Sequence, residues 1–250
     1  MQIGKRVRLS RWFSGGKTFV LVIDQGIPRG LAPQIRNNMA TWCNADNPWK
    51  AVFVHQGQVM AHEDLFASEK GLPFIIKLTS NSRDCPNTTV RSMISSVKRA
   101  VAFGASGVAI NMFVGSDFEA NHLSQFGQVV DDCEKYGMPL VVLANPAKKE
   151  DNFIAEKLAY ACMIASEMGA DIVKSEHPGT VEGHRMMVEA CLCPLVVEES
   201  CLSFDDAGTI QTVENAMAAG AAGAFLGDRL WKSDDPLALA RKVRVIIWQG

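Results

Sequence analysis

The sequence repeats one pattern eight times: a short apolar run suited to a β-strand, followed by a longer amphipathic run suited to a helix. Each expected strand is nearly continuous in apolar residues, which is typical of parallel strands covered on both faces. The expected strands are residues 18–24, 51–55, 73–78, 107–111, 139–144, 171–174, 195–198 and 223–227. The expected helices are residues 32–41, 63–68, 89–102, 118–136, 152–168, 181–191, 211–219 and 237–247.

Eight strand–helix units without a Pro/Ser-rich linker or a shift in composition favour closure of the sheet. The sequence therefore predicts an α/β fold, one (β/α)8 TIM barrel domain over residues 1–250. The alternative is an open doubly wound sheet, which usually has a glycine fingerprint after its first strand. The segment from Asp24 to Gly30 does not match that fingerprint.

The charge balance argues against polyanionic partners. The 25 basic and 27 acidic residues give a formal charge of −2, so we expect neither nucleic acid nor a membrane as a partner. The apolar stretch at residues 18–23 is too short to cross a bilayer, and residues 1–11 lack the pattern of a signal peptide. Seven scattered cysteines without metal-knuckle spacing fit reduced thiols in a cytoplasmic protein that holds no metal and no other cofactor.

Polar or ionisable residues stand at the carboxyl end of nearly every expected strand. Because the loops after the strands build the catalytic face of such barrels, this distribution indicates an enzyme. The residues are Asp24, His55, Lys77, Asn111, Asn145, Lys174, Glu198, Glu199 and Asp228.

Lys174 is the strongest candidate for chemistry because it ends the sixth expected strand, in the segment GADIVKSEHPG. A desolvated amine can attack a carbonyl, and the protonated imine that results is an electron sink for breaking or making a C–C bond. The alternative is a structural lysine at the rim, paired with Glu176.

Several segments together carry a resemblance that runs along nearly the whole chain. They are GKRVRLSRWFSGGKTFVLVIDQG, AVFVHQG, VGSDFEANHLSQFGQVVDDCEKYGMPLVVLA, GADIVKSEHPG and AMAAGAAGAFLGDRLWKSDDP. The sequence resembles the archaeal-type class I fructose-bisphosphate aldolases, which are grouped with the DhnA and LsrF-like aldolases. The resemblance implies that Lys174 forms the imine and that Asp24 assists proton transfer or orients the lysine. A capping role for Asp24 stays open.

The acid/base group departs from the family pattern. The family usually has a tyrosine before a proline after strand five, whereas this chain has Asn145. Asparagine binds hydroxyls but does not shuttle protons, so the proton transfer falls to Asp24, His177 or Glu198, or is missing. His177 is included because it lies three residues after Lys174.

The expected phosphate loops also depart from the pattern. The family binds phosphate at a glycine pair after strand seven and a Gly-Arg after strand eight. Here Glu198 and Glu199 occupy the first position, and Gly227-Asp228-Arg229 the second. We therefore expect a substrate without the usual phosphate anchor, unless Arg229 moves into the vacated position. The three carboxylates could instead bind hydroxyls, an amine or, less favourably, a divalent metal.

Other assignments stay open at this point. An inward Lys77 could promote proton loss from Lys174 or be the nucleophile, and an outward one would lie between helices. We also expect His55, Asn111 and Gly227 at the substrate, although a structural role is the simpler one for His55.

The leading hypothesis is a class I aldolase that joins or cleaves a ketone donor and an aldehyde. The alternatives are an LsrF-like acyl-transferring enzyme and an inactive barrel that acts as a binding subunit. We expect a small-molecule carbonyl substrate and a homo-oligomer. Trp12, Trp42 and Trp231 would suit an interface and internal packing equally well.

Overall fold

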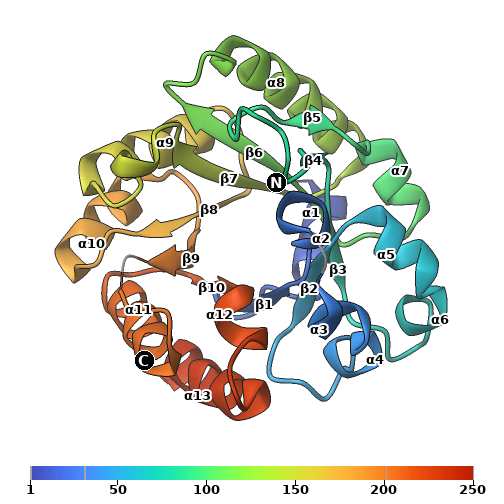
Figure 1. Ribbon diagram of the computed structural model, residues 1–250. Coiled ribbons are helices and arrows are strands. Elements are labelled where there is room, and N and C mark those ends of the chain that lie inside the picture. Colours follow the sequence, from blue (N-terminus) through green and yellow to red (C-terminus); the bar gives the residue numbers. More distant parts are fainter. Residues whose placement is uncertain (1, 31, 201, 250) are drawn as a thin grey trace.

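The computed structural model describes residues 2–30, 32–200 and 202–249, without the side chains of residues 199 and 200. Its main feature is a closed barrel of eight parallel strands, which confirms the predicted (β/α)8 fold (Figure 1). In chain order the strands are β1 (Thr18–Val22), β2 (Ala51–Val54), β3 (Phe74–Lys77), β6 (Gly107–Val114), β7 (Leu140–Pro146), β8 (Ile172–His177), β9 (Leu195–Ser200) and β10 (Gly223–Leu226). β10 pairs with β1 and so closes the ring.

Helices surround the barrel (Figure 1). The longer ones are α8 (Glu119–Tyr136), α9 (Ala155–Glu167), α10 (Val181–Ala190), α11 (Asp206–Ala218) and α13 (Pro236–Gln249). Shorter helices follow the first three strands and β10: α2 (Gly26–Arg29), α3 (Pro33–Arg36), α4 (Met39–Trp42), α5 (Gln56–Ala61), α6 (Glu63–Phe66), α7 (Val97–Ala102) and α12 (Asp228–Trp231). A 3₁₀ turn, η1 (Lys149–Asp151), follows β7.

The apolar residues form two separate layers because strand side chains alternate between the two faces of the sheet. Even and odd positions of one strand accordingly enter different clusters, as Ile172 and Val173 of β8 do. The outer layer lies between sheet and helices. The inner layer fills the barrel with Val20, Val22, Phe53, Ile75, Ala109, Val141, Leu143, Ile172, Val196 and Phe225.

The amino-terminal end of the barrel is closed by the first segment of the chain. Helix α1 (Ile3–Leu9) is anchored there by Lys5, which pairs with Glu134 and, at 2.9 Å, with Asp171 just before β8. Trp12 joins the inner layer and donates a hydrogen bond to the Ser106 carbonyl at 3.1 Å. A polar cavity is therefore confined to the opposite end, where the strands terminate.

The element boundaries differ from the prediction where tertiary contacts intervene. The expected helix 89–102 begins only at Val97, capped by Ser96, because the preceding residues form β5 (Ser92–Met93), which pairs with β4 (Thr79–Ser80). The expected helix 32–41 is split into α3 and α4, and helix 63–68 is preceded by α5. Strands β6 to β9 run past their predicted ends.

The three tryptophans considered for an interface are all buried, so in this chain they serve internal packing. Within the described ranges, no helix is both long and apolar enough to span a membrane.

Candidate active site

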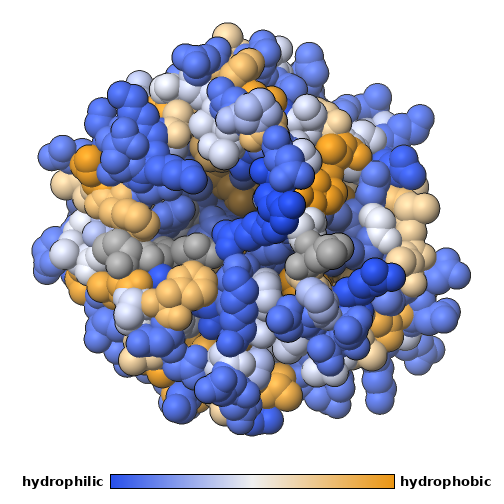
Figure 2. Space-filling model, in the orientation of Figure 1, coloured by the Kyte–Doolittle hydropathy of each residue, from blue (hydrophilic) through white to orange (hydrophobic). Residues whose placement is uncertain are grey.

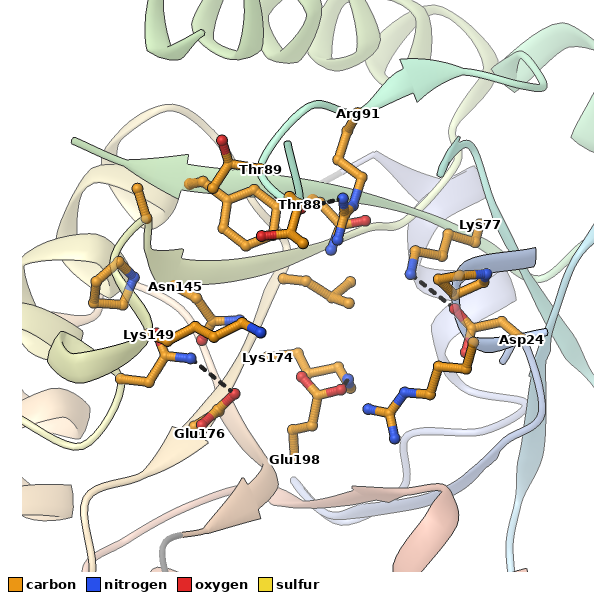
Figure 3. Close-up of a pocket in the computed structure, with 18 of the residues that line it drawn as sticks. Asp24, Lys77, Thr88, Thr89, Arg91, Asn145, Lys149, Lys174, Glu176 and Glu198 are labelled. Carbon is orange, nitrogen blue, oxygen red and sulfur yellow. Dashed lines mark hydrogen bonds and ion pairs between the residues drawn. The ribbon is translucent and has the colours of Figure 1, made fainter. Parts of the chain in front are cut away.

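A cavity of about 270 Å³ opens at the carboxyl ends of the strands. In the orientation of Figure 1, a space-filling view shows hydrophilic side chains bordering a hollow near the middle of this face (Figure 2). Figure 3 shows the side chains that line it. Its polar and charged lining is Asp24, Gln25, Arg29, Lys77, Thr88, Thr89, Arg91, Asn111, Asn145, Lys149, Asn152, Lys174, Glu176 and Glu198.

Lys174 lies at the floor of the cavity with a fully buried side chain. Strand alternation turns it inward, since its neighbour Val173 packs in the outer layer. Its Nζ lies 5.9 Å from the ring centre of Phe53, in the apolar layer below. The amine forms an ion pair with Glu198 of β9 but no well-directed hydrogen bond within the described part of the chain. A carboxylate thus lies at the amine without closing the cavity in front of it.

Asp24 and Lys77 form a second buried pair, on the side of β1 and β3 (Figure 3). Lys77 Nζ donates a hydrogen bond to Asp24 Oδ2 at 2.8 Å, and both residues line the cavity. The side chain of Lys77 therefore points into the barrel and not outward between the helices. Burial opposes ionisation of Asp24. The charges of Lys77 and His55 outweigh that effect, together with the hydrogen bond from Lys77, and the net result is a lowered pKa for Asp24. Asp24 is therefore a carboxylate at neutral pH.

The amides Asn111 and Asn145 line the cavity. The Asn111 oxygen accepts a hydrogen bond from Thr79 Oγ1 at 3.2 Å. The Asn145 oxygen lies 3.3 Å from Ser175 Oγ, whose single proton it shares with the nearer Ala144 carbonyl at 2.8 Å. Their NH₂ groups therefore remain as donors, which suits substrate hydroxyl or carbonyl oxygens.

His177 does not belong to the cavity lining, contrary to its predicted catalytic role. Because β8 continues to His177, alternation turns the ring outward onto α10, where its Nδ1 lies 3.1 Å from Nδ1 of His184. Burial lowers the pKa of His177 to about 4 and that of His184 to about 3. The prediction failed because it ended the strand at Lys174 and placed His177 in a loop.

His55 is buried beside the Asp24–Lys77 pair but lies in the wall of a neighbouring, mainly apolar cavity, with Ile23, Met39 and Met60. Burial lowers the pKa of His55, although the charge of Asp24 acts in the opposite direction. His55 therefore lies beside Asp24 but outside the cavity, and not at the substrate as expected.

The residues after β10 are placed differently from the prediction, since Asp228 and Arg229 do not line the cavity. Asp228 Oδ2 binds Arg29 at 2.6 Å and Lys232 at 2.7 Å. Arg229 donates to the carbonyls of Ser203 at 2.7 Å and of residue 202 at 3.0 Å. Arg229 has therefore not moved into the position of a phosphate-binding arginine.

Gly227 adjoins the cavity indirectly. A Cβ at this position would lie 2.3 Å from Nε2 of Gln25, so the glycine leaves room for that side chain. Gln25 lines the cavity, and its Oε1 is buried without a hydrogen-bond partner in the described structure. The Glu199 side chain lies outside the described part of the chain.

Sequence reasoning missed the side chains that loops bring to the cavity. Thr88, Thr89 and Arg91 lie in the loop that connects β4 to β5, and Lys149 begins η1. These residues lie far from the strand ends in sequence, so the rule that active groups directly follow strands does not include them. Within residues 2–30, 32–200 and 202–249, no three His, Cys, Asp or Glu side chains are grouped as a metal site.

Comparison with known proteins identifies the family. The sequence profile described as "DeoC/LacD family aldolase" matches residues 18–233. The chain belongs to this family. The aldolase is also 30% identical to 2-amino-3,7-dideoxy-D-threo-hept-6-ulosonate synthase 1 of Archaeoglobus fulgidus, over 98% of this chain and 91% of the relative.

Solved structures agree with this assignment. The aldolase superimposes on an archaeal fructose 1,6-bisphosphate aldolase with a TM-score of 0.87 and 25% identity, covering 99% of this chain and 100% of the other. A second archaeal fructose-1,6-bisphosphate aldolase, whose catalytic lysine is covalently bound to the carbinolamine intermediate, superimposes with a TM-score of 0.84 and 25% identity, covering 98% and 99%. The resemblance to archaeal-type class I aldolases and the expected Schiff-base aldolase function are thereby confirmed at the level of the family.

Proposed function

We propose that this chain makes or breaks a C–C bond between a ketone donor and an aldehyde through an imine on Lys174. The observation that carries the proposal is the fully buried Lys174 amine, which faces a polar cavity and contacts the carboxylate of Glu198. An amine in this setting is shielded from water and has a proton acceptor at hand, which are the two requirements of a lysine nucleophile.

Glu198 is the proposed acid/base group at the amine. It accepts a proton from Lys174, and the neutral Nζ attacks the carbonyl carbon. A proton then passes from this nitrogen to the alkoxide oxygen, which gives the neutral carbinolamine. Glu198 returns the proton to the carbinolamine hydroxyl, which leaves as water, and the nitrogen lone pair forms the protonated imine. This assignment gives Glu198 the proton transfer that Asn145 cannot perform.

C–C cleavage then needs a base for the substrate hydroxyl. We assign this step to Glu198 as well: it takes the hydroxyl proton, the C–C bond breaks, and the electron pair enters the imine to give an enamine and an aldehyde. Asp24 and Lys77 form a fixed ion pair at 2.8 Å that orients substrate hydroxyls. The amide groups of Asn111 and Asn145 donate hydrogen bonds from the neighbouring wall.

The proposed substrate is a small polyhydroxylated carbonyl compound. The cavity volume of about 270 Å³ lies just below the range of about 300–1,000 Å³ that is typical of ligand pockets, so the substrate is small. The relatives named above act in the chemistry of a heptulosonate and of fructose bisphosphate, both sugar-like.

Borohydride trapping tests the nucleophile. We expect reduction in the presence of dihydroxyacetone, pyruvate or dihydroxyacetone phosphate to add the mass of a secondary amine, mapped to Lys174 by peptide mass spectrometry. Lys174→Met should abolish the adduct, whereas Lys77→Met, the matched change of the other buried cavity lysine, should retain it at Lys174. An adduct on Lys77, or none with any of the three compounds, would refute the proposal.

We further propose a homo-oligomer in the cytoplasm that needs no cofactor, since the imine itself serves as the electron sink. The six described cysteines are free thiols, as is usual in reducing compartments. On helix α1, the side chains of Ile3 and Val7 are exposed one turn apart and could enter a subunit contact. Light scattering coupled to size-exclusion chromatography measures the oligomeric state.

A further inference from the structure

We infer that Arg91 and Lys149 form an anion subsite that binds a carboxylate or phosphate group of the substrate. The inference rests on the proposed function, because the anion belongs to the molecule whose carbonyl reacts with Lys174. It places the charged end of the substrate beside the β4–β5 hairpin and η1, and not at the ends of β9 and β10.

The first argument is the pairing of charges around the cavity. Of the described side chains in the lining, five are cationic and three are carboxylates. Lys174 pairs with Glu198, Lys77 with Asp24, and Arg29 with Asp228. Arg91 and Lys149, in contrast, have no carboxylate partner among the described residues. The third carboxylate of the lining, Glu176, accepts a hydrogen bond from Asn152 Nδ2 at 3.4 Å and forms no ion pair with either cation among these described side chains. Even with Glu176 counted, two cations stand against one carboxylate, so the lining keeps an excess positive charge, which Arg91 and Lys149 carry.

The second argument is the way in which Arg91 is held. Its Nη1 donates to the carbonyls of Thr88 at 2.5 Å and of Val90 at 3.0 Å, and its guanidinium lies 4.9 Å from the ring centre of Phe113. Burial lowers the pKa of Arg91, although the charges of Cys85 and Asp24 act in the opposite direction, so the guanidinium is partly desolvated. A guanidinium fixed in this way presents its remaining N–H groups as a fork suited to an oxyanion.

The third argument is convergence from two separate parts of the chain. Figure 3 shows Arg91 and Lys149 pointing into the cavity from the β5 side and the β7 side, with Thr88 and Thr89 nearby. Thr89 Oγ1 donates to Asn87 Oδ1 at 2.7 Å, which fixes the loop, and Thr88 lines the cavity beside it. Two cations that enter one cavity from separate loops supply donors of the kind that carboxylates and phosphates need.

The opposite wall, at the ends of β9 and β10, is less suited to binding an anion. Asp228 is occupied by Arg29 and Lys232, Arg229 is occupied by backbone carbonyls, and Glu198 adds negative charge beside Lys174. An anionic group next to β9 would meet that carboxylate at close range, which is repulsive. The substrate class that follows is a carbonyl compound with one anionic terminus, bound with that terminus at Arg91.

Matched carbonyl compounds test the inference through the concentration that gives half-maximal borohydride trapping at Lys174. The pairs are dihydroxyacetone phosphate against dihydroxyacetone, and succinic semialdehyde against butanal. In the wild-type protein, we expect one of the two anionic compounds to reach half-maximal trapping at a concentration at least tenfold below that of its neutral partner. The pair of compounds that shows this difference tells whether the subsite prefers phosphate or carboxylate. Arg91→Met and Lys149→Met should each reduce this preference by about tenfold, because each raises the concentration needed for the anionic member more than that for its neutral partner.

Lys148→Met is the matched control, because Lys148 is the exposed neighbour of Lys149 and does not line the cavity. It should leave every value unchanged. Equal trapping of anionic and neutral compounds by wild type, or an equal loss of both in the Arg91 variant, would overturn the inference.

Calorimetric titration separates this inference from the imine chemistry. Inorganic phosphate and succinate bind without forming an imine, so the measurement stands even if no carbonyl compound is trapped. We expect one of the two to bind wild type and the Lys174→Met variant alike, and to bind the Arg91→Met variant at least tenfold more weakly. Binding of neither anion, or binding unaffected by Arg91→Met, would overturn the subsite while leaving the aldolase proposal intact.

Discussion

Removing both members of the Asp24–Lys77 pair should destabilise the protein less than the sum of the two single removals. The two charges are 2.8 Å apart with side chains only 7–8% exposed, so their attraction is about 6 kcal/mol at an effective dielectric constant of about 20. Loss of one partner leaves the other charge buried, which costs about 3–5 kcal/mol. Asp24→Asn should approach this range, and Lys77→Met should cost less, because the charge of Lys174 still stabilises the Asp24 carboxylate.

Urea unfolding followed by tryptophan fluorescence measures these effects as a double-mutant cycle. We expect the double variant to be more stable than the sum of the single changes predicts, with a coupling energy of about 2–3 kcal/mol. The matched control is Asp84→Asn, which breaks an exposed pair with Arg83 and should change stability by less than about 1 kcal/mol. Additive single changes below about 1 kcal/mol each would show that the Asp24–Lys77 pair is not the desolvated contact described above.

Two further predictions concern the scaffold. His177 and His184 are neutral in the folded protein and have pKa values of about 4 and about 3, whereas an unfolded histidine titrates near 6.5. Between pH 6.5 and these values only the unfolded state binds protons at the two histidines. The free energy of unfolding should therefore fall by up to about 1.4 kcal/mol per pH unit for each histidine as the pH drops below 6.5. The double variant His177→Gln/His184→Gln should flatten this slope when urea unfolding is measured as a function of pH. At the start of β10, Gly223 has φ +135° and a Cβ there would lie 1.8 Å from a β1 carbonyl oxygen. Thermal melting should therefore show that Gly223→Ala destabilises the protein by more than about 3 kcal/mol. The control is Gly127→Ala in α8, where a Cβ would meet open space and the change should be neutral or stabilising. Equal melting temperatures of the two variants would contradict the close approach at Gly223.

The barrel was predictable because its signal is carried by local sequence. Strands covered on both faces are apolar throughout, and the helices between them are amphipathic. Each strand–helix unit can therefore be predicted from its own residues, without reference to the neighbouring units. The predictions of secondary structure are wrong where a tertiary contact determines the local structure. The segment before Val97 has a helical pattern, yet Thr79 pairs with Met93 and holds it as a hairpin. The sequence of residues 89–96 does not indicate that this segment pairs with a strand at residue 79.

The candidate site was predictable to the extent that strand ends meet at one edge of the barrel. Lys77, Lys174 and Glu198 were found because they follow apolar runs directly and alternation turns them inward. Arg91 and Lys149 were missed because loops fold back over the mouth, and sequence distance from a strand does not measure distance from the cavity. His177 shows the reverse error, since a strand longer than predicted carries it to the outer face.

The two departures from the family pattern around Lys174 compensate each other in space. Strand β8 pairs with β7 on one side and with β9 on the other, so Asn145 and Glu198 approach Lys174 from opposite neighbours. The resemblance places the acid/base tyrosine at the position of Asn145, whereas here the titratable group at the amine comes from β9, where the family has glycine. A carboxylate at that position excludes a phosphate from the same wall by charge repulsion. Relocating proton transfer to β9 therefore requires relocating the anion, and Arg91 and Lys149 on the far wall supply the charge for it.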